Sequence, residues 1–159
     1  MNAGAAQARG DVLWFLHADT VPVPDADESV LEMLAKSPRS WGRFAVRLSG
    51  GHRLLRLVEG MMNLRSCLTG IATGDQGIFV RRAVFDAVAG FADIPLMEDV
   101  ALCRRLRRHS RPICIRKMLV TSSRRWEERG VIKTVITMWW LRLAYFLGAD
   151  PRRLAAWYR

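Results

Sequence analysis

The chain has 159 residues, of which 50% are hydrophobic, so it is long enough for one sizeable core and too short for two independent domains. Its formal net charge of +10 lies in the last third, where residues 104–159 carry 15 Lys/Arg against 3 Asp/Glu, whereas residues 1–103 carry 10 against 12. Charge alone therefore leaves phosphorylated ligands, anionic lipid and nucleic acid open as partners, because net charge informs association and not fold.

The first half of the chain alternates between the two regular structures. A small-residue helix within "MNAGAAQARGD" leads into an apolar strand that begins at Val12. Acidic residues after two prolines predict a helix that begins near Asp25 or Asp27, and residues 42–51 predict a half-buried strand. Residues 53–66 return to helical spacing.

The second half continues this alternation. A loop, "TGIATGDQ", precedes the strand "GIFV", and "RRAVFDAVAGF" predicts a short helix closed by Gly90. The segment "EDVALCRRLRRHSR" predicts a helix, "RPICIRKMLVTS" predicts a strand, and the rest is helical and rich in aromatic residues. This order indicates an α/β fold with a mostly parallel sheet.

Polar residues directly follow the first predicted strand, in "VLWFLHADT". Asp19 has the carboxylate that Mg²⁺ or Mn²⁺ takes as a ligand while substrate phosphates complete its shell, and His17 could join that shell or orient it. A turn former or helix cap is the ordinary alternative for such an aspartate, and a solvated or core histidine for His17.

Two adjacent carboxylates, Glu98 and Asp99, open the helix that follows "PLM". Acidic residues at a helix N-terminus often serve only the helix dipole. A carboxylate within reach of an acceptor hydroxyl can also remove its proton as a new bond forms, and Asp99 is our candidate for that role.

Two further segments have polar residues suited to binding a substrate. Gly74, Asp75 and Gln76 lie in a glycine-containing loop before a strand, which lets backbone amides approach a ligand, although no P-loop pattern is present. In "TSSRRWEERG", Arg124, Arg125 and Trp126 could clamp a diphosphate, or could form a solvated basic turn.

Taken in order, these segments resemble a family 2 glycosyltransferase of the GT-A fold, and in particular the small bacterial "transferase 2" type. They are "NAGAAQARGDVLWFLHADT", "TGIATGDQGIFVRR", "GFADIPLMEDVALCRRL" and "TSSRRW". The resemblance implies a Rossmann-like GT-A domain over residues 1–130 and an inverting hexosyltransferase that uses a nucleotide-sugar donor, a hydroxyl acceptor and Mn²⁺ or Mg²⁺.

The same resemblance implies roles for individual residues. Asp19 corresponds to the last acid of a DxD-like motif that holds the metal, Asp99 to the general base of an ED pair, and Arg125 and Trp126 to a QxxRW-like motif near the diphosphate. His17 stands where that DxD motif has its first acid, and Ser122 stands where QxxRW has its glutamine. The family's N-terminal βαβα half, with the nucleoside contacts, has no counterpart here, so we expect a partial domain.

The C-terminal segment, residues 131–159, has an apolar run from Val131 to Leu147 that Lys133 and Arg142 interrupt. This run is too short and too charged to cross a membrane comfortably as a helix. An amphipathic helix at an anionic membrane surface, which would make a lipid-linked acceptor plausible, and a helix packed on the core or in a dimer contact are both open.

Two other functions compete with glycosyl transfer. "FLHADT" resembles the DxDxT segment of haloacid dehalogenase-type phosphatases, but His17 occupies the position of their nucleophile. A non-enzymatic basic module for a membrane surface or nucleic acid is the other alternative, although no nucleic-acid-binding motif is present and no specific nucleic acid is expected.

Cys67, Cys103 and Cys114 are odd in number and lack CxxC spacing. We therefore expect neither a disulfide framework nor a zinc cluster, and we expect a reducing cytoplasmic setting. If the C-terminal helix lies at a membrane surface, the protein would be peripheral at the inner face of that membrane. The N-terminus has no signal-peptide pattern.

Overall fold

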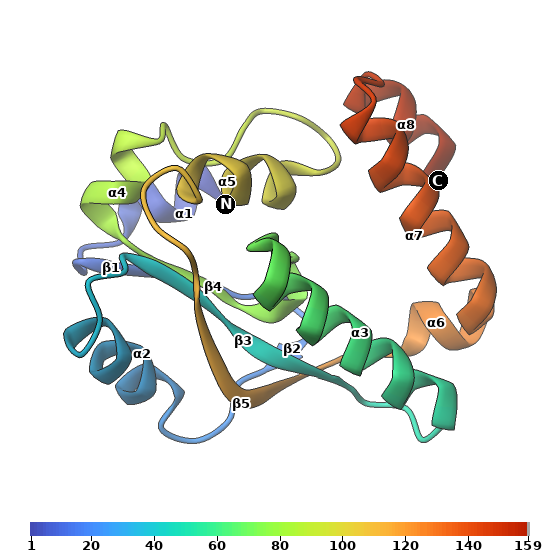
Figure 1. The fold of residues 1–159 in the computed structure, drawn as a ribbon, viewed down its shortest axis with the longest axis horizontal. Helices are drawn as coiled ribbons and strands as arrows, with labels where there is room; N and C mark the ends of the chain where they lie inside the picture. The colour runs from blue at the N-terminus through green and yellow to red at the C-terminus, as the bar shows by residue number, and fades with distance from the viewer. Residues whose placement is uncertain (159) are drawn as a thin grey trace.

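The computed structural model describes residues 1–158, which form a mixed α/β structure with one five-stranded sheet and helices on both of its faces (Figure 1). The strands are β1 (Val12–Phe15), β2 (Thr20–Val21), β3 (Trp41–Leu48), β4 (Ile78–Arg81) and β5 (Ile113–Thr121). The helices are α1 (Asn2–Gln7), α2 (Ala26–Ala35), α3 (Arg53–Thr69), α4 (Arg82–Ala87), α5 (Glu98–Leu106), α6 (Arg124–Arg129), α7 (Val131–Phe146) and α8 (Pro151–Tyr158), with a 3₁₀ turn η1 at Gly74–Gln76. The predicted α/β class is confirmed.

The sheet has the strand order β1-β4-β3-β5-β2, and only the β3–β5 pair is parallel. The pairs β1–β4, β3–β4 and β2–β5 are antiparallel, so the predicted mostly parallel sheet is wrong. Hydrophobic periodicity identifies a strand but does not give its direction. After α3, the chain enters β4 in the direction opposite to β3. The connection through α3 is therefore not the parallel crossover that alternating strands and helices predict.

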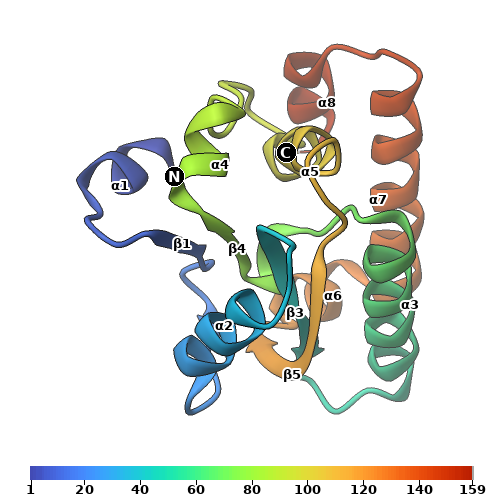
Figure 2. The same ribbon diagram turned by 60° about the vertical axis from the view of Figure 1, so that its left-hand side comes forward.

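Each face of the sheet packs against its own helices. Helix α2 covers one face through Val30 and Leu34, which pack with Phe44, Phe79 and Leu119. The opposite face packs against α4, α5 and the C-terminal helices, with Trp41, Val80, Phe85, Leu102 and Leu106 buried together. Figure 2 shows α2 on the side of the sheet away from α3 and α7.

Strand β3 is buried on both faces, which differs from the predicted half-buried strand. Arg43, expected on the open face, is only 3% exposed because α3 lies over it. Its guanidinium donates hydrogen bonds to the carbonyl oxygens of Phe44 (3.0 Å) and Asn63 (2.5 Å). Alternation along one strand does not reveal the helix that later covers its polar face.

The C-terminal helices contribute to the main core and also expose apolar side chains. Leu141 of α7 and Leu154 of α8 are buried in the same cluster as Trp41 and Leu102. The side chains of Trp139 and Trp140 on α7 are 59% and 50% exposed. Within residues 1–158, no helix combines the length and hydrophobicity that crossing a membrane requires.

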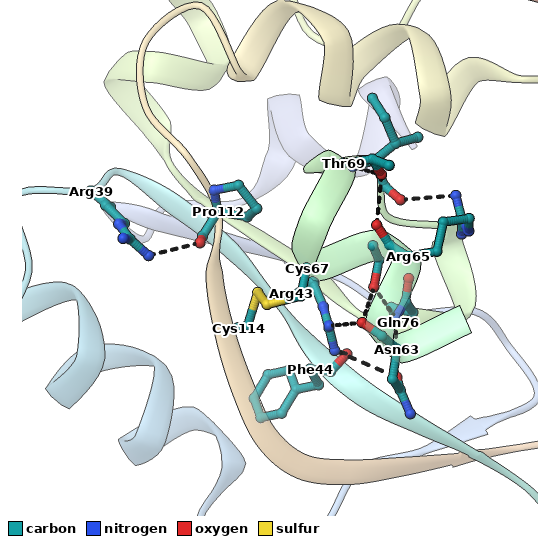
Figure 3. The surroundings of a disulfide bond; sticks show 12 residues. Arg39, Arg43, Phe44, Asn63, Arg65, Cys67, Thr69, Gln76, Pro112 and Cys114 are labelled. Atoms are coloured by element: carbon teal, nitrogen blue, oxygen red, sulfur yellow. Dashed lines mark hydrogen bonds between the residues drawn. A yellow bond between two sulfur atoms is a disulfide. The ribbon is translucent and has the colours of Figure 1, made fainter. Parts of the chain in front are cut away.

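A disulfide joins Cys67 on α3 to Cys114 on β5, with a Cα–Cα separation of 6.1 Å (Figure 3). The expectation of no disulfide is therefore wrong. Spacing rules describe cysteines that are close in sequence, whereas this pair is 47 residues apart and meets only because α3 packs beside β5. The inference of a reducing setting rested on that expectation and loses its basis. Cys103 is a buried free thiol.

We predict that reduction of this disulfide lowers the free energy of unfolding by about 2–4 kcal/mol, because a cross-link across a loop of this length restricts the unfolded chain. Urea denaturation with and without dithiothreitol measures the effect. The double variant Cys67→Ser/Cys114→Ser should start at the lower stability and show no response to reductant. Equal midpoints for the oxidised and reduced wild-type protein would contradict the prediction.

Candidate functional site

A cavity of about 560 Å³ lies between α3, α5, α6 and α7, at the end of the sheet where β1 stops. Its wall along α3 and α7 is mostly apolar, and most of its polar groups come from loops and helix ends. Seven of the residues that the sequence singles out line it: His17, Gly74, Asp75, Glu98, Asp99, Arg125 and Trp126.

The loop before β4 is held in place by the side chain of Gln76, which is fully buried. Its Oε1 accepts the N–H of Thr73 (3.2 Å), and its Nε2 donates to the hydroxyl of Ser66 (2.9 Å) and to Oδ1 of Asn63 (3.3 Å). With both ends of the amide engaged by the protein, Gln76 positions the loop. Gln76 is not among the lining residues, whereas Gly74 and Asp75 are, and its predicted substrate contact stays a prediction.

Gly74 lies against the imidazole of His17, where a Cβ atom would collide with Nε2. The glycine thus permits the loop between β1 and β2 to approach the loop before β4. The N–H of Gly74 donates to Oδ2 of Asp99 at 3.1 Å, which connects this loop to the start of α5. Three segments far apart in the sequence therefore meet at one end of the cavity.

Asp99 lies in the first turn of α5, whose N-cap residue, Met97, adopts a left-handed conformation with φ of 68°. Its Oδ1 accepts the N–H of Val100 at 2.7 Å. Burial raises the pKa of Asp99 from 3.8 to about 6, with a further contribution from the charge of Glu98 and a smaller one from Asp75. These outweigh the two backbone hydrogen bonds, which lower the pKa. Asp99 is thus ionised at neutral pH yet far more basic than an exposed aspartate.

The two predicted metal ligands, His17 and Asp19, both follow β1 but differ in their relation to the cavity. His17 lines the cavity, whereas Asp19 is exposed and is not among the lining residues. Across residues 1–158, no group of three or more His, Cys, Asp or Glu side chains is placed to hold a metal ion. The predicted site needs only one or two protein ligands, with donor phosphates completing the metal's shell, so the role of Asp19 and His17 stays a prediction.

Helix α6 places its three predicted residues differently. Arg124 is exposed and pairs with Glu128 at 3.9 Å, away from the cavity. Arg125 lines the cavity, donates to the hydroxyl of Tyr158, and lies over that ring at 5.3 Å from its centroid. Trp126 lines the cavity and packs beside the cluster of Leu48, Leu55 and Val58. Arg125 and Trp126 are placed to contact a ligand in the cavity, whereas Arg124 is not among the lining residues and its predicted contact stays a prediction.

Three cavity residues with long polar side chains were not predicted as part of the site: Arg65 on α3, Arg142 on α7 and Tyr158 on α8. Arg142 had a signal, because it interrupts an apolar run. Arg65 had none, since an arginine in an amphipathic helix is ordinary. Tyr158 depends on the return of α8 over α6, which local sequence does not encode.

We predict that Asp99 makes stability depend on pH. Its pKa is higher in the folded protein than in the unfolded chain, so the stabilisation by the bound proton is complete below about pH 4 and is lost as the pH rises through 6. Relative to wild type, Asp99→Asn should therefore gain roughly 2–3 kcal/mol of unfolding free energy between pH 4 and pH 8. Chemical denaturation at several pH values measures this gain.

The matched control is Asp86→Asn, which changes an exposed aspartate on α4. Its stability difference from wild type should stay nearly constant over the same pH range. If the unfolding free energies of Asp99→Asn and wild type changed with pH in parallel, Asp99 would have an ordinary pKa.

Comparison with known proteins bears on the first half of the chain. The family model described as "Glycosyl transferase family 2" matches residues 1–86, which include His17, Asp19 and the Gly74–Gln76 turn. The carboxylates of α5 and the arginines of α6 follow the matched region. No curated protein matches the chain. Because the match covers more than half of the sequence, the chain belongs to glycosyl transferase family 2.

Proposed function

We propose that this protein transfers a sugar from a nucleotide-sugar donor to a hydroxyl acceptor, with inversion at the anomeric carbon and with Asp99 as the general base. Membership of the family supports glycosyl transfer in general. The observation that carries the finer proposal is the basic, half-buried carboxylate of Asp99 at the polar end of a large cavity.

Asp99 would accept the proton of the acceptor hydroxyl while the oxygen forms a bond to the anomeric carbon. The bond from that carbon to the diphosphate breaks at the same time, and its electron pair leaves with the nucleoside diphosphate. A pKa near 6 suits this task, because the base is largely ionised at neutral pH and holds a proton more firmly than an exposed carboxylate. Gly74 orients the carboxylate through its N–H.

Arg125 would stabilise the departing diphosphate through its guanidinium, and Trp126 beside it would cover the donor from water. Preorganised cations aimed at developing charge are effective because they need no rearrangement during the reaction. In the protein as it stands, Tyr158 holds Arg125 by a hydrogen bond and by contact with its ring. Asp75 and Glu98, which also line the cavity, would contact sugar or acceptor hydroxyls.

We predict that Asp99→Asn lowers kcat for sugar transfer by about 10²–10⁴-fold, the usual contribution of a general base, while donor binding changes little. Release of nucleoside diphosphate from UDP- and GDP-sugars in the presence of alcohol acceptors measures turnover. Asp86→Asn, remote from the cavity, serves as the matched control. Full activity of Asp99→Asn would remove Asp99 from the mechanism.

The pH profile offers an independent check. Turnover by wild type should fall about tenfold per pH unit below pH 6, where Asp99 becomes protonated. Glu98→Gln removes a charge that raises the pKa of Asp99, so the fall in turnover on the acidic side of the profile should begin at a lower pH. A fall that begins at the same pH would show that another group governs the profile.

The predicted metal role of Asp19 can be tested separately. If Asp19 binds Mn²⁺ together with donor phosphates, Asp19→Ala should increase the Mn²⁺ concentration needed for half-maximal donor binding by about tenfold or more. Calorimetric titrations of donor at a series of Mn²⁺ concentrations measure this shift. Identical Mn²⁺ dependence in Asp19→Ala and wild type would exclude Asp19 as a ligand.

A further inference from the structure

Two arginines face the cavity without a carboxylate partner. Arg65 comes from α3 and Arg142 from α7, and both also line a smaller adjoining cavity of about 230 Å³. The ion pairs among residues 1–158 involve other side chains, at Glu32–Lys36, Arg56–Glu59 and Arg124–Glu128. Arg65 and Arg142 therefore present their charges to the cavity itself.

Arg65 is only partly satisfied by the protein. One guanidinium nitrogen, Nη1, donates to the carbonyl of Ile71 at 3.2 Å, whereas Nη2 is buried and has no hydrogen-bond partner in the described chain. A buried donor that lacks a partner is costly, because it has lost water and gained nothing in exchange. Because Arg65 also lines the cavity, a ligand oxygen could supply the missing partner after a small movement of this side chain.

The positive charge of Arg142 also disfavours the charged form of Arg65. Burial is the largest cause that lowers the pKa of Arg65, to about 10, and the charge of Arg142 acts in the same direction. Burial lowers the pKa of Arg142 as well, while Asp99 and Asp75 oppose the effect on both groups. An anion between the two guanidinium groups would relieve this repulsion, and planar guanidinium groups suit phosphate oxygens.

The same cavity continues as an apolar groove between α3 and α7. Its lining residues are mostly aliphatic, thioether or indole side chains, among them Met61, Leu64, Leu68, Val135, Met138 and Trp139. Leu64 and Leu68 are exposed at 62% and 65%, and Trp139 at 59%, so the groove opens to solvent. A nucleotide or a free sugar would leave this apolar surface in water.

We propose that the acceptor is an anionic lipid whose headgroup phosphate binds Arg65 and Arg142, whose chain lies in the groove between α3 and α7, and whose headgroup hydroxyl meets Asp99. Charge complementarity selects this occupant, since only a ligand with an anionic head and an apolar chain matches both parts of the cavity. The fate of the hydroxyl rests on the proposed function. Its proton passes to Asp99, its oxygen bonds to the sugar carbon, and the nucleoside diphosphate departs with the electron pair.

Binding of monomeric oleoyl lysophosphatidate, which combines one chain, a phosphate and a free hydroxyl, tests the proposal without donor or turnover. Tryptophan fluorescence should report affinity at least about tenfold tighter than for glycerol 3-phosphate, which lacks the chain, or for monoolein, which lacks the phosphate. Arg65→Gln/Arg142→Gln should abolish the preference over monoolein. Leu64→Asp should weaken lipid binding about tenfold or more and leave glycerol 3-phosphate unaffected.

Matched controls use exposed residues outside the groove. Arg47→Gln/Arg116→Gln removes two exposed arginines, and Leu31→Asp changes a leucine on α2 that is 59% exposed, as open as Leu64. Neither should alter binding. Equal loss in these controls, or equal affinity for monoolein and the lysophosphatidate, would overturn the proposal.

Two competing occupants give distinct results. One-for-one displacement of the lipid by UDP-glucose would assign the arginines to the donor diphosphate and overturn the proposal. Binding to phosphatidylglycerol vesicles without binding to the monomeric lipid would assign the apolar face to a membrane surface, with the same consequence. Failure of the proposed function alone looks different, since lipid binding would then persist while no sugar is transferred.

Discussion

The hydrogen bond from Gly74 to Asp99 is the contact on which the site depends. It joins the loop before β4 to the first turn of α5, and each of these segments is fixed by a different part of the protein. Gln76 anchors the loop to α3 through Ser66 and Asn63. Buried apolar residues of α5 anchor the helix to the main core. The carboxylate is therefore positioned by the whole fold and not by its immediate neighbours.

Asp99 shows how burial and hydrogen bonding can be balanced in one group. Two backbone N–H donors would ordinarily hold an aspartate at low pKa, as in many helix caps. Here desolvation and two neighbouring carboxylates, Glu98 and Asp75, outweigh them. A single aspartate in a helix N-terminus thus differs chemically from the exposed acids at the start of α2, although the local sequences look alike.

Local patterns predicted most helices and strands because the spacing of apolar residues in the sequence follows the periodic burial of each element. The strand at Val12–Phe15 and the helix at Glu98–Leu106 occur where their patterns place them. The direction of β4, the burial of Arg43 and the Cys67–Cys114 bond were not predictable in this way, since each depends on which element packs over another.

The candidate site divides along the same line. His17, Gly74, Asp75, Glu98 and Asp99 stand in loops or at helix ends, where polar residues after apolar runs attract notice, and all line the cavity. Arg65 and Arg142 lie within amphipathic helices, where charge is expected on the solvent side. Only the position of α7 beside α3 brings these two arginines to the same cavity.

The disulfide has a mechanical consequence for the groove. Cys67 ties α3 covalently to β5, so this wall moves with the sheet. The other wall, α7, has no such tether to the sheet and begins directly after Gly130, whose φ of 82° is accessible chiefly to glycine. Leu141 packs α7 into the main core without a covalent link, so reduction of the disulfide would loosen the α3 wall of the groove and leave the α7 wall held as before.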